Sequence, residues 1–173
     1  HRGFAREIGA LLNVPFVPES QFLTKIPLAQ DAKKFKATAE FPFSISINSS
    51  DCIRFSALYI DEVGYEPSQI KMASRLLRLD NRAIDLFVDA TNYVMLDMGQ
   101  PLHAFDAQTL MGKTIEPRQA KKGEKLELLD GTKLDLVKDD MVIADAKTPL
   151  ALAGIKGGLA SGVTSKTSSI LLE

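Results

Sequence analysis

The sequence has few of the residues on which metal and thiol chemistry depend. Its 173 residues contain two histidines, His1 and His103, and one cysteine, Cys52. A zinc site needs several histidine or cysteine ligands, so such a site is excluded, and a single cysteine cannot form an internal disulfide. We therefore expect no metal bound by this chain, and a reducing, cytoplasmic setting in which Cys52 is a small packed hydrophobic residue.

Several signatures of nucleotide and ester chemistry are also missing. The chain has no Gly-x-Ser-x-Gly elbow, no P-loop and no Rossmann fingerprint, which argues against a serine hydrolase, a kinase or a dehydrogenase. The net charge of −1 provides no overall basic excess, so any contact with nucleic acid has to be local. No apolar run approaches the roughly 20 residues that span a bilayer.

Hydrophobic residues make up 45% of the chain, which is enough for a substantial core. Helical spacing of apolar residues predicts helices at 1–13 and 69–79 and a central helix that ends at Gly99. Alternating or short apolar runs predict strands at 41–48, 54–63, 114–120, 120–129, 134–136, 141–144, 150–153 and 170–172. Because their connections are short, we predict an α+β fold, a layered, β-sandwich-like sheet of mostly short strands flanked by helices.

The same patterns predict local details. The inward residues of helix 69–79 are expected to be Ile70, Ala73, Leu76 and Leu77, and those of strand 41–48 to be Phe43, Ile45 and Ile47. Asp130 and Gly131 are compatible with a type I′ hairpin turn. Asp89, Gln100 and Asp106 are interpreted as structural residues of the helix surface and of loop caps.

The most distinctive stretch surrounds the end of the central helix. Residues 89–95 read Asp-Ala-Thr-Asn-Tyr-Val-Met, and residues 99–106 read Gly-Gln-Pro-Leu-His-Ala-Phe-Asp. Together with Cys-Ile-Arg-Phe at 52–55 and Ala-Gly-Ile-Lys-Gly-Gly at 153–158, these segments resemble the B3/B4 domain of the β subunit of bacterial phenylalanyl-tRNA synthetase. The resemblance covers roughly residues 43–173.

The resemblance implies an editing activity. In that family the domain hydrolyses the ester that joins tyrosine, attached in error, to the phenylalanine tRNA. A pocket for phenylalanine cannot strongly reject the same ring bearing a hydroxyl, whereas a second site that binds the hydroxyl can discriminate well. The resemblance also implies the phenylalanine tRNA and the synthetase α subunit as partners in an α2β2 assembly, with ATP and Mg²⁺ bound elsewhere and no cofactor in this part.

The resemblance also assigns site residues. Glu173 matches the glutamate that recognises the tyrosine hydroxyl, and Ala153 and Gly154 match small residues that line the slot for the ring. The residues expected around the amino-acid backbone and the scissile ester are His103, Thr91 and Asn92. We expect water to attack the carbonyl, oriented by His103 and neighbouring polar groups, without a covalent intermediate, because no activated nucleophile is evident.

The resemblance divides the chain into two parts. Residues 1–36 are expected to be the end of a preceding small domain, a helix with a proline-containing linker, and residues 37–173 the editing domain. The lysines of the linker, Lys33, Lys34 and Lys36, are interpreted as solvated rather than as a patch that binds RNA. Because the chain starts at His1 and stops at Glu173 after an apolar run, we expect an excerpt of a longer protein.

For each candidate site residue, a purely structural interpretation remains open beside the functional one. A loop histidine is often structural, a helical threonine often bonds back to its own helix, and a glutamate at a strand end often faces solvent. The glycine cluster 154–158 is either a tight turn or a backbone that approaches a ligand, and its Lys156 replaces the usual methionine of the family.

These readings leave three functions in competition. The first is editing hydrolysis. The second is a non-catalytic, structural and tRNA-contacting module of the same synthetase with a decayed pocket, for which Lys156, Asn81 and Asp85 depart from the family pattern. The third is an unrelated ligand-binding module that shares only the fold. Editing requires His103, Thr91, Gly154 and Glu173 to converge on one cavity.

Overall fold

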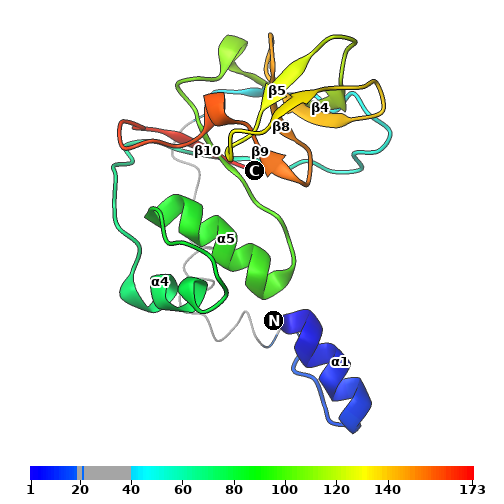
Figure 1. Cartoon of the computed structure of the whole chain (residues 1–173), viewed down its shortest axis with the longest axis vertical. Coiled ribbons are helices and arrows are strands. Elements are labelled where there is room, and N and C mark those ends of the chain that lie inside the picture. Colours follow the sequence, from blue (N-terminus) through cyan, green and yellow to red (C-terminus); the bar gives the residue numbers. More distant parts are fainter. Residues whose placement is uncertain (19–20, 22–39) are drawn as a thin grey trace.

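The chain folds into a group of helices beside a layered group of short-stranded sheets (Figure 1). The computed structural model describes residues 1–18, 21 and 40–173. Most of the expected linker, with Lys33, Lys34 and Lys36, lies outside the described residues, so the boundary at residue 36 stays a prediction. Among the described residues, no helix combines the length and apolarity needed to cross a membrane.

The elements confirm the α+β prediction. The helices whose bounds lie within the described residues are α1 (Arg2–Leu12), α4 (Ile70–Leu77) and α5 (Leu86–Met98), with 3-10 turns η1 (Met111–Lys113) and η2 (Leu159–Ser161). The strands are β1 (Ser44–Ile45), β2 (Leu58–Ile60), β3 (Ala104–Asp106), β4 (Thr114–Gln119), β5 (Lys125–Glu127), β6 (Lys133–Asp135), β7 (Met141–Ala144), β8 (Pro149–Leu152), β9 (Lys156–Gly157) and β10 (Ile170–Leu172).

The strands form three sheets that pack around two apolar clusters. A five-stranded sheet has the order β1-β4-β7-β8-β9, a three-stranded sheet the order β2-β10-β3, and β5 pairs with β6. Among the described strands, β1 and β4 are the one pair that runs parallel. The largest core cluster joins Phe105 and Leu171 of the three-stranded sheet to Ile115, Ile143 and Ala151 of the five-stranded sheet. The two sheets therefore pack against each other through their apolar faces, as the predicted layering requires.

The strand predicted at 41–48 is much shorter than expected. Only two of its residues form β1, and an isolated bridge from Asn48 to Arg118 extends the pairing. Phe43 packs against the core, but Ile45 and Ile47 are exposed, so their predicted inward orientation is wrong. β1 lies at the edge of the sheet and pairs only with β4 among the described strands, which leaves Ile45 38% exposed.

The β5–β6 hairpin has a different turn from the one predicted. A type I′ turn needs a positive φ at both central residues. Gly131 has a φ of 81°, but the φ of Asp130 is not positive. The Gly131 amide donates to the Leu128 carbonyl at 2.8 Å, and the Leu128 amide donates to the Thr132 carbonyl at 2.8 Å. The loop therefore has three residues with the glycine in the left-handed position, which is the next commonest hairpin connection.

The helices bury less of their apolar surface than their sequences predict. On α4, Leu76 is buried, but Ile70 is 87% exposed and Leu77 is 59% exposed, so both were wrongly assigned to the inward face. Among the described elements the main packing partner of α4 is α5, which covers the side of α4 that carries Leu76. The apolar face of α1, including Phe4 and Leu11, is exposed as well.

Helix α5 is held at both ends and from below. The Asp85 carboxylate caps its first turn by accepting from the amides of Phe87 at 2.9 Å and Val88 at 3.0 Å. Gly99 ends it in the left-handed conformation, as predicted. Asp89 was predicted on the helix surface and is instead fully buried, where it accepts from the Ser68 hydroxyl and from the Ile84 amide.

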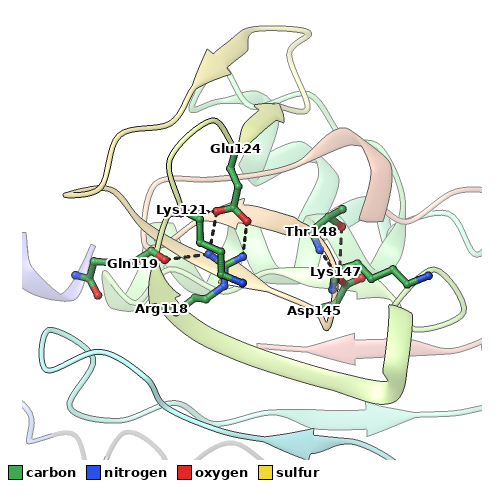
Figure 2. A network of polar contacts seen from close by, with 7 residues as sticks. All are labelled: Arg118, Gln119, Lys121, Glu124, Asp145, Lys147 and Thr148. Atoms are coloured by element: carbon green, nitrogen blue, oxygen red, sulfur yellow. Dashed lines mark hydrogen bonds and ion pairs between the residues drawn. The ribbon is translucent and has the colours of Figure 1, made fainter.

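Carboxylates also fix the turns of the five-stranded sheet (Figure 2). The nearly buried Arg118 guanidinium makes a bidentate pair with Glu124 at 2.9 and 2.7 Å, and this holds the pKa of the Glu124 carboxyl below its usual range. Asp145 accepts from the amides of Lys147 and Thr148, both at 2.8 Å. The first contact joins β4 to the turn that follows it and the second lies within the turn between β7 and β8, so both are interpreted as parts of the scaffold.

Replacing Asp89 with alanine tests the importance of its buried contacts. We expect Asp89→Ala to lower the free energy of unfolding by about 2 kcal/mol, because the Ile84 amide and the Ser68 hydroxyl lose their acceptor inside the protein. Asp135→Ala, at an exposed carboxylate of β6, should change it by less than about 0.5 kcal/mol. Equal effects in chemical denaturation would show that the buried carboxylate is not a structural anchor.

Candidate functional site

Strand pairing places His103 beside Glu173. In the antiparallel register of β3 and β10, Ala104 lies opposite Leu172, so the next residues, His103 and Glu173, also face each other. The Glu173 amide donates to the His103 carbonyl at 2.8 Å. Two of the residues assigned to the site from the sequence are thus brought together by the sheet, although they lie far apart in the chain.

The glycine cluster reaches the same place through Gly157. A Cβ atom built on Gly157 would lie 2.1 Å from Cε1 and 2.5 Å from Nε2 of His103, so the imidazole occupies the space that any side chain would need. The Gly157 carbonyl accepts from the Leu129 amide at 3.1 Å, and Gly157 pairs with Ala151 of β8. The cluster is therefore both a turn and a surface on which the histidine rests.

Sequence reasoning singled out Gly154 and missed Gly157. Gly154 has a φ of 69° and open space where a Cβ would lie, so it is required by the turn between β8 and β9. Gly157 has no positive φ, and only its contact with His103 explains why a glycine stands there. The signal in the sequence was the Gly-Gly pair, but it does not say which glycine carries the contact.

The His103 imidazole is neutral and incompletely bonded. Its ring lies edge-on to Phe105, with 4.5 Å between the ring centroids. Nε2 is the one buried side-chain nitrogen or oxygen without a hydrogen-bond partner in the described part of the chain. Burial lowers the pKa of His103 to about 4, so the ring is uncharged at pH 7. An unsatisfied buried nitrogen is costly, and a ligand or water that bonded it would relieve that cost.

Burial also shifts the pKa of the Glu173 carboxyl, but upward rather than downward. Burial raises its pKa to about 7, because the charged form is poorly solvated where it lies. A neutral imidazole and a carboxyl that titrates near neutrality thus stand on neighbouring positions of two strands. Titratable groups perturbed in this way mark candidate functional sites.

The other residues assigned from the family are not in recorded contact with this pair. Thr91 is buried in α5, and its hydroxyl donates to the Val88 carbonyl at 2.7 Å, which is the structural alternative expected for a helical threonine. Asn92 is half-buried and makes no side-chain hydrogen bond among the described residues. Helix α5 contacts β3, so both lie on an element that borders the strand after His103.

Ala153 packs against the core cluster that contains Ala151 and Leu171, and its amide donates to the Met141 carbonyl at 2.9 Å. Its neighbour Gly154 is exposed. The assignment of both residues to a slot for the substrate ring stays a prediction. Two cavities, of 440 and 500 Å³, lie along α1, α4 and α5, and neither is lined by His103 or Glu173.

Lys156 forms an ion pair with the neighbouring hairpin. Its ammonium group lies 2.8 Å from the Asp130 carboxylate in the β5–β6 turn, and this contact holds the pKa of Asp130 well below its usual range. The ion pair ties the glycine cluster to the neighbouring hairpin. The lysine that replaces the usual methionine is therefore engaged at the surface of the sheet.

The family model and the curated relatives that match this chain agree with each other. The family model described as the B3/4 domain matches residues 51–173. The phenylalanine–tRNA ligase beta subunits of Aquifex aeolicus and Pseudomonas fluorescens are 41% and 42% identical over 172 and 176 residues. These alignments cover 99% of this chain and 20% of each relative, so the chain spans about a fifth of the length of the curated relatives it matches.

Among solved structures, an N-terminal fragment of the phenylalanyl-tRNA synthetase beta-subunit from Pyrococcus horikoshii is 17% identical, with a TM-score of 0.48. It covers 75% of this chain and 42% of that chain.

Substituting Gly157 tests the packing beneath the histidine. We expect Gly157→Ala to destabilise the fold by about 1–3 kcal/mol and to shift the His103 imidazole resonances, because the new methyl group displaces the ring. Gly64→Ala is the matched control, since its Cβ would meet nothing within 4 Å and its φ is not positive. Unchanged His103 resonances in the Gly157 variant would contradict the contact.

Proposed function

The chain belongs to the B3/4 domain family, and from that membership we propose that it hydrolyses the ester of tyrosyl-tRNA(Phe), as an editing part of a phenylalanine–tRNA ligase β subunit. The observation that carries the proposal is the pair of His103 and Glu173, which a backbone hydrogen bond holds side by side. Burial lowers the pKa of His103 and raises the pKa of Glu173. The proposed local reaction is ester hydrolysis, not aminoacylation.

Glu173 supplies the discrimination in this proposal. A buried carboxyl can accept a hydrogen bond from the tyrosine hydroxyl, and a bond to its ionised form is about twice as strong as one between neutral groups. Phenylalanine offers no such donor, so a bound phenylalanyl group would leave the carboxyl buried and unpaired. That asymmetry is large, since sites built to bond a substrate hydroxyl reject the analogue without it by up to about 10⁴–10⁵.

His103 orients the attacking water. A base whose pKa lies near 4 removes protons poorly at pH 7, so its contribution is to hold water rather than to deprotonate it outright. In this proposal Nε2, which is buried and has no partner in the described part of the chain, accepts a hydrogen bond from that water. The water oxygen attacks the ester carbonyl carbon, the bond to the ribose oxygen breaks, and the products are tyrosine and tRNA with a free hydroxyl.

The partners of this function follow from the same proposal. The substrate is the charged phenylalanine tRNA, and the assembly partner is the synthetase α subunit in an α2β2 enzyme. In this proposal ATP and Mg²⁺ serve aminoacylation outside this part of the enzyme. The ester hydrolysis itself needs no nucleotide to drive it. No group of three His, Cys, Asp or Glu side chains within the described ranges is arranged to hold a metal ion.

The second candidate is a non-catalytic module of the same synthetase that only contacts tRNA. One observation favours it: the Thr91 hydroxyl is committed to its own helix, so the expected set of polar groups around the ester is smaller.

Deacylation of tyrosyl-tRNA(Phe) by the assembled ligase separates the two candidates. We expect hydrolysis well above the buffer rate, and a loss of about 100-fold in kcat for His103→Ala because the water is no longer oriented. Glu173→Ala should lose the preference for the tyrosyl over the phenylalanyl ester. Glu127→Ala, at a surface carboxylate of β5, is the matched control and should leave both quantities unchanged.

Two results would count against the proposal. A wild-type rate no faster than buffer would favour the non-catalytic module. An unaltered preference for tyrosine in Glu173→Ala would show that another group reads the hydroxyl.

A further inference from the structure

Positive side chains gather on and just after α4. Between positions 71 and 82 the sequence has Lys71, Arg75, Arg78 and Arg82 against a single acid, Asp80, in a chain whose net charge is −1. Positions 71, 75 and 78 are four and three residues apart, a spacing that puts them on one side of a helix. All three side chains are exposed.

These cations have no carboxylate partners. Across residues 1–18, 21 and 40–173, the recorded ion pairs of Lys125, Lys133 and Lys156 each involve an acid, but none involves Lys71, Arg75 or Arg78. The Arg75 guanidinium bonds instead to the Tyr93 hydroxyl, and it lies 5.9 Å from the centroid of that ring. A neutral partner orients the guanidinium without cancelling its charge.

A cavity opens beside these groups. It has a volume of 440 Å³, and its polar border consists of Arg75 and Arg78 on one side and Tyr93 and Asp97 of α5 on the other. The rest of its border consists of His1 and the leucines Leu76, Leu79 and Leu96. The volume lies in the range of ligand sites. Two guanidinium groups outweigh the one carboxylate, so the cavity favours an anion. An aromatic ring beside arginine forks suits a phosphate with its neighbouring ribose or base.

We propose that Lys71, Arg75 and Arg78, with Tyr93, form a surface that binds the sugar–phosphate backbone of the tRNA. This inference rests on the proposed function and adds a place of contact to it. Helix α5 links the two regions, because it packs against α4 and also contacts β3, which follows His103 (Figure 1). The C-terminal end of the chain, at Glu173, lies on the side of the sheets nearer to the helices (Figure 1). A tRNA held on α4 therefore approaches the site from the helical side.

The test is the salt dependence with which uncharged tRNA(Phe) binds to the assembled ligase. The variant is the triple substitution Lys71→Gln, Arg75→Gln and Arg78→Gln. We expect its Kd to rise at least about tenfold near 100 mM salt, and the slope of log K against log salt to fall by about 2–3, since each lost phosphate contact removes nearly one unit. Fluorescence anisotropy of labelled tRNA measures both.

Two matched variants control the result. Lys122→Gln, Lys138→Gln and Lys166→Gln remove the same charge from exposed lysines that have no recorded ion pair, and should leave the slope unchanged. The double substitution Arg75→Lys and Arg78→Lys keeps the charge and should keep most of the slope, which separates loss of charge from damage to the fold.

Distinct outcomes overturn the inference. Equal slopes for wild type and the α4 triple variant would remove this surface from tRNA binding, and a loss of subunit assembly with an unchanged slope would make it a protein contact. Binding of uncharged tRNA does not depend on hydrolysis, so a reduced slope in an enzyme that fails to deacylate would uphold this surface while the editing proposal fell. At saturating tRNA, the triple variant should retain kcat and show a raised KM.

Discussion

The pairing of β3 with β10 is the constraint on which the candidate site depends. Its last hydrogen bond, from the Glu173 amide to the His103 carbonyl, holds two polar side chains where neither is well solvated. The same desolvation lowers the pKa of the imidazole and raises that of the carboxyl. Two such costs at adjacent positions mark this place as a candidate functional site.

The surrounding structure keeps that pairing in register. Asp106, at the end of β3, accepts from the Thr167 hydroxyl at 2.6 Å, and the Ala107 amide donates to the Ser169 carbonyl at 3.0 Å, so the segment before β10 is fixed to β3. Phe105 and Leu171 are buried between the sheets and prevent the strands from sliding without exposing apolar surface. The His103 imidazole packs directly against Gly157, so the glycine cluster supports the position of the ring.

The sequence predicted what local pattern determines and missed what depends on neighbours. The run of β7 and the helix stop at Gly99 are written in consecutive residues, and the structure confirms both. The family segment around His103 is also local, and the match of residues 51–173 to the family model confirms the family. The burial of Asp89 and the exposure of Ile70 depend on which element packs nearby. The helical spacing of apolar residues does not contain that information. Gly157 could not be separated from the adjacent glycine, because its role lies in a contact with a side chain from another strand.

The claim that one poorly solvated place holds both groups is tested most directly by NMR titration of the isotopically labelled chain. The account predicts that His103 protonates only near pH 4 and that the Glu173 carboxyl titrates near pH 7. Ordinary values, near 6.5 for the histidine and 4.5 for the glutamate, would place both side chains in water and contradict a shared site.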